Sequence, residues 1–175
     1  MQICKEGDMM EEIWDLYDKN KNKTGVTHKR VDIATIPEGM YHMVVEVWVK
    51  RPDGKILFTK RHPDKHYPLL WECSGGSAVS GEISKEAASR ELFEETGIWA
   101  DKNQLIYLGD TVSKLHFTDT YLYKVPDNNV KLNLQLTEVV DSMWLDAEEI
   151  IANKEVIVPT VWARYQIYKE KLHTL

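Results

Sequence analysis

The sequence predicts an α/β sandwich built around a mixed β-sheet. Strand-like runs dominate the middle of the chain, and a few helical stretches are interleaved with them. The length of 175 residues fits one compact domain with a core of its own. We therefore expect a single domain over residues 1–175, in which residues 1–25 form an N-terminal extension.

The first element along the chain is ambiguous. Ile13, Trp14 and Tyr17 suit one face of a helix, yet the run EIWDLYD suits a short strand equally well, and the sequence leaves the choice open. The polar segment 18–25, DKNKNKTG, is typical of an exposed loop.

The clearest local prediction is a β-hairpin. Residues 43–50 are dense in Val and Trp, which predicts a strand, and residues 56–60 form its partner. Pro52, Asp53 and Gly54 between them supply turn chemistry. Further strands are predicted at 104–112, 115–125, 130–136 and 142–145.

Three helical segments accompany the strands. Residues 84–96 form a helix that stops at Gly97, because glycine tolerates positive φ at a helix end. A helical turn follows at 147–152, and Pro159 opens a last helix. Apolar side chains recur at helical spacing in that last helix, which predicts core packing and no ligand site: Val161, Trp162, Tyr165, Tyr168 and Leu172.

Composition narrows the class of partner. With 22 Lys+Arg against 28 Asp+Glu, the formal net charge of -6 disfavours a protein that grips a nucleic acid polymer. No stretch approaches the roughly 20 apolar residues of a membrane span, and no signal-peptide segment is visible, so we expect a soluble, cytoplasmic protein without a membrane partner. Cys4 and Cys73 lack CxxC spacing and are expected to be reduced thiols.

An acidic helix face carries the chemistry. In residues 76–98, GSAVSGEISKEAASRELFEETGI, helical spacing puts Glu91, Glu94 and Glu95 on one face. Like charges so placed destabilise a helix by roughly a few tenths of a kcal/mol per pair unless a cation lies among them. Hard oxygen ligands of this kind suit Mg²⁺ or Mn²⁺. Arg90 beside them can orient a carboxylate through bidentate bonds.

A solvated acidic surface is the ordinary alternative, but the segment also satisfies a longer pattern. That pattern is G-x(5)-E-x(7)-R-E-U-x-E-E-x-G-U, with U a bulky aliphatic residue, and a chance match is on the order of one in ten million. It is met by Gly76, Glu82, Arg90, Glu91, Leu92, Glu94, Glu95, Gly97 and Ile98. The segment resembles the Nudix box, the signature of the Nudix hydrolase family.

The resemblance implies an α/β/α sandwich and metal-dependent cleavage of a diphosphate linkage. It implies that the metal ligands are Glu91, Glu94, Glu95 and a backbone carbonyl at Gly76. Arg90 is the implied orienting residue.

The general base is left open by the resemblance. Family members take it from the box or from a glutamate on a later loop. Glu138 is the candidate here, Asp119 is a weaker one, and a solvated surface glutamate is the alternative reading of Glu138.

Longer stretches resemble the Nudix branch that contains isopentenyl-diphosphate isomerases and related hydrolases: WDLYD, MYHMVVEVWV, DGKILFTKRHPDKHYPLLWECSGG and MWLDAEEI. This resemblance implies that Arg61 and Lys65 bind the diphosphate and that His42 matches a metal-binding histidine.

The departures from the isomerases are more informative. Gly75 and Ser77 stand where isomerases carry a catalytic Cys and a metal-binding His, and Cys73 lies two residues away from the Cys position. We therefore rank a hydrolase of a nucleoside diphosphate derivative or other organic diphosphate first. An isopentenyl-diphosphate isomerase and a non-catalytic diphosphate-binding module are the alternatives. The sequence leaves the oligomeric state open, a homodimer included.

Overall fold

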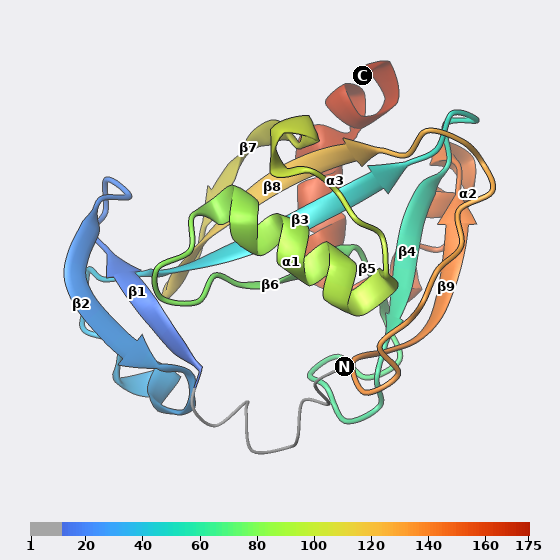
Figure 1. The fold of residues 1–175 in the computed structure, drawn as a ribbon. Coiled ribbons are helices and arrows are strands. Elements are labelled where there is room, and N and C mark those ends of the chain that lie inside the picture. The colour runs from blue at the N-terminus through green and yellow to red at the C-terminus, as the bar shows by residue number, and fades with distance from the viewer. Residues whose placement is uncertain (1–11) are drawn as a thin grey trace.

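The computed structural model describes residues 12–175, and a mixed sheet lies at their centre (Figure 1). Five strands follow one another in the order β5-β4-β3-β8-β7, while β6 pairs with β3 and β9 pairs with β4. The β3–β8 pair is parallel, and the other pairs in this sheet are antiparallel. The strands are β3 (His42–Lys50), β4 (Ile56–Arg61), β5 (Trp71–Glu72), β6 (Ser74–Ser77), β7 (Ile106–Val112), β8 (His116–Lys124) and β9 (Val139–Leu145).

The sheet divides into two wings at the turn between β3 and β4. One wing contains β3, β6, β7 and β8, and the other contains β4, β5 and β9. Strands β3 and β4 pair only where Lys50 faces Ile56, beside a turn in which the Gly54 N–H donates to the Arg51 carbonyl at 2.9 Å. Beyond that turn β4 and β9 run at a steep angle to β3 and β8 (Figure 1). The short strand β6 pairs with β3 on the side that β4 has left.

Helices cover both faces of the sheet, which confirms the α/β/α sandwich (Figure 1). Because side chains alternate along β3, Val45 and Val47 pack with α1 (Ser84–Thr96), whereas Trp48 packs with α3 (Pro159–Thr174). The short helix α2 (Ala147–Ala152) follows β9. Of the predicted α3 stripe, Trp162 is partly buried and the other four side chains are core residues: Val161, Tyr165, Tyr168 and Leu172.

The ambiguous first element is a strand. Strand β1 (Ile13–Tyr17) pairs with β2 (Lys23–Lys29), so the polar loop is shorter than the predicted 18–25. The hairpin stands beside the sheet (Figure 1) and is followed by a 3₁₀ helix over Arg30–Thr35. The Lys21 Nζ in the hairpin turn lies 2.5 Å from the Asp119 carboxylate on β8, and Trp14 of β1 is buried.

The predicted strand at 130–136 is wrong, because this segment is a loop. Its backbone bonds run to the end of α1 and not to a neighbouring strand: Asn133 N–H donates to the Thr96 carbonyl at 2.8 Å, and Gln135 N–H to the Glu95 carbonyl at 3.1 Å. The last strand, β9, starts at Val139, three residues earlier than predicted.

Two further sequence predictions concern other parts of the chain. Within residues 12–175, no helix is long and apolar enough to cross a membrane. Cys4 lies outside the described residues, whereas Cys73 is a free, buried cysteine.

A substitution at Gly97 tests how tightly the loop that contains Asn133 packs against the end of α1. We expect Gly97→Ala to lower the free energy of unfolding by at least about 1 kcal/mol more than Gly39→Ala does. Both glycines have nearly equal positive φ, 74° and 78°, but a Cβ at Gly97 would fall 2.9 Å from the Asn133 Cβ, and at Gly39 it meets nothing within 4 Å. Urea denaturation of both variants measures the difference, and equal losses would contradict the close packing.

Candidate active site

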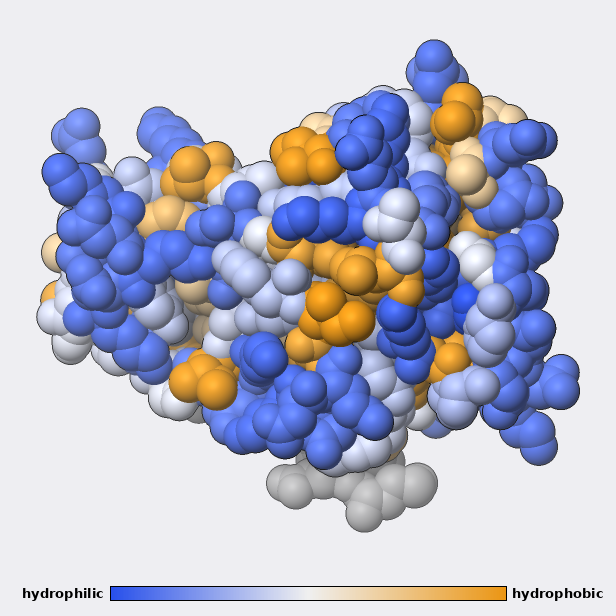
Figure 2. All heavy atoms as spheres, turned by 90° about the horizontal axis from the view of Figure 1, so that it is seen from above, coloured by the Kyte–Doolittle hydropathy of each residue, from blue (hydrophilic) through white to orange (hydrophobic). Residues whose placement is uncertain are grey.

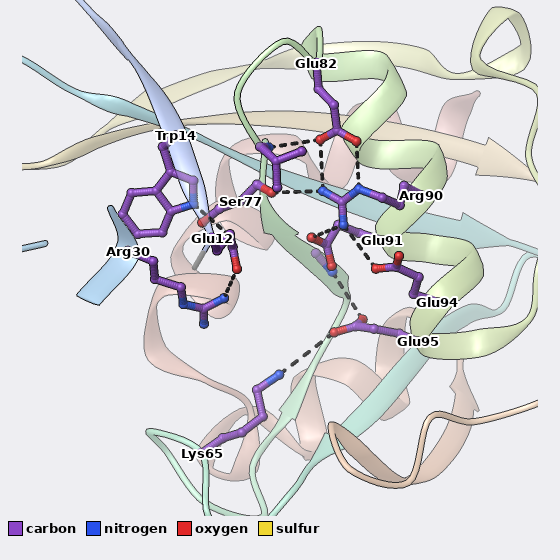
Figure 3. Close-up of polar contacts among 12 residues, drawn as sticks. Glu12, Trp14, Arg30, Lys65, Ser77, Glu82, Arg90, Glu91, Glu94 and Glu95 are labelled. Atoms are coloured by element: carbon purple, nitrogen blue, oxygen red, sulfur yellow. Dashed lines mark hydrogen bonds and ion pairs between the residues drawn. The ribbon is translucent and has the colours of Figure 1, made fainter. Parts of the chain in front are cut away.

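Arg90, near the middle of α1, is the charged centre of the site. Its guanidinium binds Glu82 through two parallel bonds, from Nε at 2.7 Å and from Nη2 at 2.9 Å. Its Nη1 lies 2.8 Å from Glu91 and 3.0 Å from Glu94, and Nη2 also donates to the Ser77 carbonyl at 3.0 Å (Figure 3). One planar cation therefore holds the box loop and two helix carboxylates together.

Glu91 lies directly against the backbone of β6. A Cβ at Gly76 would fall 2.3 Å from the Glu91 carboxyl carbon, so only glycine leaves room for this carboxylate. Burial raises the pKa of Glu91 to about 6, although Arg90 acts in the opposite direction. The predicted ligands Glu91 and Gly76 are thus in contact.

Glu95 is buried next to a second cation. It is 4% exposed, and its carboxylate accepts a bond from the Gly75 N–H at 3.3 Å (Figure 3). The Lys65 Nζ lies 3.9 Å from Glu95 and 2.8 Å from Glu138. Burial, reinforced by the neighbouring Glu72 carboxylate, raises the pKa of Glu95 well above its usual value. Lys65 therefore brings the loop residue Glu138 next to the box.

Glu72 on β5 belongs to the same charged group, although it was not among the predicted site residues. It binds Arg61 and lies 3.9 Å from Lys65. Burial raises the pKa of Glu72 above its usual value, and the neighbouring Arg61 and Lys65 offset only part of that rise. Its sequence signal is its place just before Gly75-Gly76, in the stretch DGKILFTKRHPDKHYPLLWECSGG. Arg61, Glu72 and the two glycines line a cavity of about 210 Å³.

The carboxylates of the site suit a hard divalent ion. Within residues 12–175, no three His, Cys, Asp or Glu side chains are grouped closely enough to hold a metal. Arg90 and Lys65 lie among the carboxylates of the site. Glu91 and Glu95 are nevertheless oxygen donors whose ionised forms are disfavoured by burial. A cation beside them would offset that penalty, so the donor set fits Mg²⁺ or Mn²⁺.

The N-terminal hairpin holds the loop that leads into α1, a role that the sequence pattern did not predict. Asp15 accepts bonds from the Ser80 hydroxyl at 2.7 Å and the Gly81 N–H at 3.0 Å. The Ser80 N–H donates to the Ile13 carbonyl at 2.7 Å. Burial acts to raise the pKa of Asp15, but bonds from Lys23, Gly81 and Ser80 outweigh it and lower the value to about 2.

Three other singled-out residues have different surroundings. Cys73 is buried, and burial together with the nearby Glu46 raises the pKa of its thiol. Asp119 accepts from Lys21 in the hairpin turn. His42 stacks on Trp14, with ring centroids 4.0 Å apart.

The chain belongs to the Nudix hydrolase family, because the NUDIX domain model matches residues 40–166. An uncharacterized Nudix hydrolase of Listeria monocytogenes is 38% identical over 151 residues, which cover 82% of this chain and 84% of that protein. The branch that contains the isomerases stays a prediction.

Solved structures agree with the fold. The protein DR0079 of Deinococcus radiodurans has a TM-score of 0.73 at 20% identity and covers 89% of this chain and 98% of its own. The bifunctional NMN adenylyltransferase/ADP ribose pyrophosphatase of Francisella tularensis, solved with AMP and a Mn ion, has a TM-score of 0.65 at 20% identity. That match covers 82% of this chain and 45% of the other.

Replacing Arg90 tests the network of charges. We expect Arg90→Lys to lower the free energy of unfolding by about 1–3 kcal/mol, since a single ammonium cannot reproduce the paired bonds to Glu82 and still reach the helix carboxylates. Lys102→Gln, which removes the exposed pair with Glu86, is the control and should leave the melting temperature nearly unchanged. Equal effects of the two substitutions in thermal denaturation would contradict a central role for Arg90.

Proposed function

We propose that the protein is a divalent-metal-dependent hydrolase that cleaves a diphosphate linkage in a nucleoside diphosphate derivative or another organic diphosphate. The observation that carries the proposal is the convergence of Glu91, Glu95, Lys65 and Glu138 around Gly75-Gly76. The fold neighbour from Francisella tularensis, named as an ADP ribose pyrophosphatase, supports the same reaction class.

The proposed metal ligands are Glu91, Glu94, Glu95 and the carbonyl of Gly76, and the proposed ion is Mg²⁺ or Mn²⁺. Such an ion, when bound, neutralises charge on the bridging phosphate oxygens and makes water more acidic. Arg90 orients the carboxylates through the bonds described above.

Residues outside the box are proposed to bind the substrate and to accept a proton from the attacking water. Arg61 and Lys65 bind the diphosphate oxygens, since Arg61 lines the cavity beside Gly75-Gly76 and the Lys65 Nζ lies 3.9 Å from Glu72 in the same lining. Glu138 accepts a proton from the water as its oxygen attacks phosphorus. The bond between that phosphorus and the bridging oxygen then breaks, which gives two phosphate-bearing products.

Hydrolysis suits the residues better than isomerisation does. An allylic isomerase must protonate one carbon and deprotonate another while the diphosphate stays intact. Gly75 has no side chain, and the Ser77 hydroxyl is a poor proton donor at neutral pH. The Cys73 thiol is buried and its pKa is raised, which disfavours proton transfer by this residue.

The box carboxylates provide the main test. We expect Glu95→Gln to lower kcat by about 10²–10³ while the melting temperature is kept, because glutamine fills the same buried space without a charge. Phosphate release from a panel of organic diphosphates with Mg²⁺ or Mn²⁺ measures the rate, and calorimetry measures metal affinity. Glu86→Gln on the same helix is the matched control. Unchanged metal affinity in Glu91→Gln, Glu94→Gln and Glu95→Gln would refute the metal site.

A second experiment separates the hydrolase from the isomerase. We expect no deuterium incorporation into isopentenyl diphosphate in D₂O, followed by mass spectrometry, because the aligned positions carry no suitable acid and base. Diphosphate cleavage should persist in Cys73→Ala. Deuterium incorporation that disappears in Cys73→Ala would instead assign isomerase activity.

A further inference from the structure

The box loop, residues 78–83, leads from β6 into α1 and has little buried apolar surface in its second half. Ser80 and Gly81 are exposed, and Ile83 is 53% exposed. Ile83 is also the N-cap residue of α1, where no side-chain hydrogen bond caps the helix, because an isoleucine side chain has no acceptor atom. The position of the loop therefore depends on polar contacts from elsewhere in the fold.

Asp15 on β1 supplies these contacts. One of its carboxylate oxygens accepts a bond from the Ser80 hydroxyl at 2.7 Å. The other oxygen accepts bonds from the Gly81 N–H at 3.0 Å and from the Lys23 Nζ at 2.6 Å. The same Lys23 Nζ lies 3.4 Å from the Glu82 carbonyl oxygen. Both oxygens of one carboxylate therefore bind the box loop, and the cation paired with that carboxylate reaches the next residue of the loop.

The direction of the Asp15 side chain follows from its place in β1. Trp14 and Leu16 pack in a small core with Ile36, whereas Tyr17 packs in the larger core that contains residues of α1. Because side chains alternate along a strand, Asp15 lies on the same side of β1 as Tyr17. Figure 2 shows the hairpin as a lobe, at the left, that a concave surface sets apart from the rest of the molecule. The bonds of Asp15 therefore join this lobe to the loop that begins the box helix.

From the box loop, hydrogen bonds continue to the carboxylates of α1. Glu82 directly follows Gly81 and accepts the two parallel bonds from Arg90, at 2.7 and 2.9 Å. Arg90 in turn lies 2.8 Å from Glu91 and 3.0 Å from Glu94 (Figure 3). A shift of the box loop would therefore move Glu82, and with it the guanidinium that orients two of the proposed metal ligands.

We propose that Asp15 is a positioning residue for the metal site. By fixing the box loop it fixes Glu82 and, through Arg90, the orientation of Glu91 and Glu94. Asp15 itself contacts neither the ion nor the substrate. It precedes residue 40, where the NUDIX domain match begins, so a segment outside that match supports the box. This inference rests on the proposed function for the presence of the ion.

Asp15→Asn in the full chain is the main test. Ser80 and Gly81 bind different oxygens of Asp15, and asparagine retains only one of them. Loss of a group that orients a metal ligand typically costs about 10–100-fold in metal affinity or activity, and Asp15 acts from further away, so we expect about 3–10-fold. Calorimetry with Mn²⁺ measures the affinity, and phosphate release measures kcat. The KM for the diphosphate at saturating Mn²⁺ should stay unchanged, because Asp15 has no contact with Arg61 or Lys65.

Asp18→Asn is the matched control. Asp18 lies in the turn of the same hairpin and accepts bonds from the N–H groups of Asn20 at 2.8 Å and Asn22 at 3.0 Å, so its bonds stay within the hairpin. This substitution should leave Mn²⁺ affinity and kcat unchanged. Ser80→Ala removes one of the Asp15 bonds from the exposed side of the loop and should weaken Mn²⁺ binding less than Asp15→Asn does. The double variant should be little worse than Asp15→Asn alone, because both substitutions break the same contact.

A spectroscopic measurement separates positioning from a contribution to stability alone. Solvent exchange of the Arg90 Nε–H proton, followed by NMR in the metal-free protein well below the melting temperature, reports the bond to Glu82. This exchange should be faster in Asp15→Asn than in the wild type and in Asp18→Asn. If Asp15→Asn lowers the melting temperature but leaves both the Arg90 exchange and the Mn²⁺ affinity unchanged, Asp15 only stabilises the fold and the inference is overturned.

The same measurement separates this inference from the proposed function. If the wild type binds no Mn²⁺ and cleaves no diphosphate, the proposed function fails, and the Arg90 exchange still decides whether Asp15 fixes this guanidinium. If the wild type binds Mn²⁺ and Asp15→Asn binds it equally well, the proposed function stands and the role of Asp15 is refuted.

Discussion

Two cations, Arg90 and Lys65, lie among the carboxylates on the acidic face of α1 and offset their mutual repulsion. Glu91, Glu94 and Glu95 repel one another at helical spacing. Arg90 binds the first two, and Lys65 lies near the third. Each cation also binds a carboxylate on another segment: Arg90 binds Glu82 in the box loop, and Lys65 binds Glu138 in the loop before β9. The same ion pairs therefore connect α1 to both loops.

The divergence of the two wings of the sheet makes room for this arrangement. Where β4 leaves β3, β6 takes its place and brings a backbone without side chains against Glu91. The wing formed by β4, β5 and β9 carries Arg61 and Glu72, which line a cavity together with the same glycines. Charged groups from this wing and from α1 therefore meet at Gly75-Gly76.

The N-terminal hairpin contacts the box loop and also lines a cavity of about 440 Å³ together with residues of β3 and β8. Asp15 binds the box loop. Trp14, the adjacent residue in β1, lines the cavity between the hairpin and the sheet. Alternation along a strand explains how one short element serves both sides. The Lys21–Asp119 pair anchors the far end of the hairpin to β8. A displacement of the hairpin would thus affect the cavity and the entry to α1 together.

The sequence by itself determined the family, the α/β/α class, most elements and the helix that carries the box. It could do so because helical periodicity, turn residues and the box spacing are local properties. It did not decide whether EIWDLYD is a strand, and it mistook 130–136 for one, because both depend on where distant backbone groups find partners. The contacts of Lys65 with Glu138 and Glu72, the close approach of Gly76 to Glu91, and the cavity at His42 were decided only by the tertiary structure. Each joins segments whose separation in sequence carries no information about their distance in space.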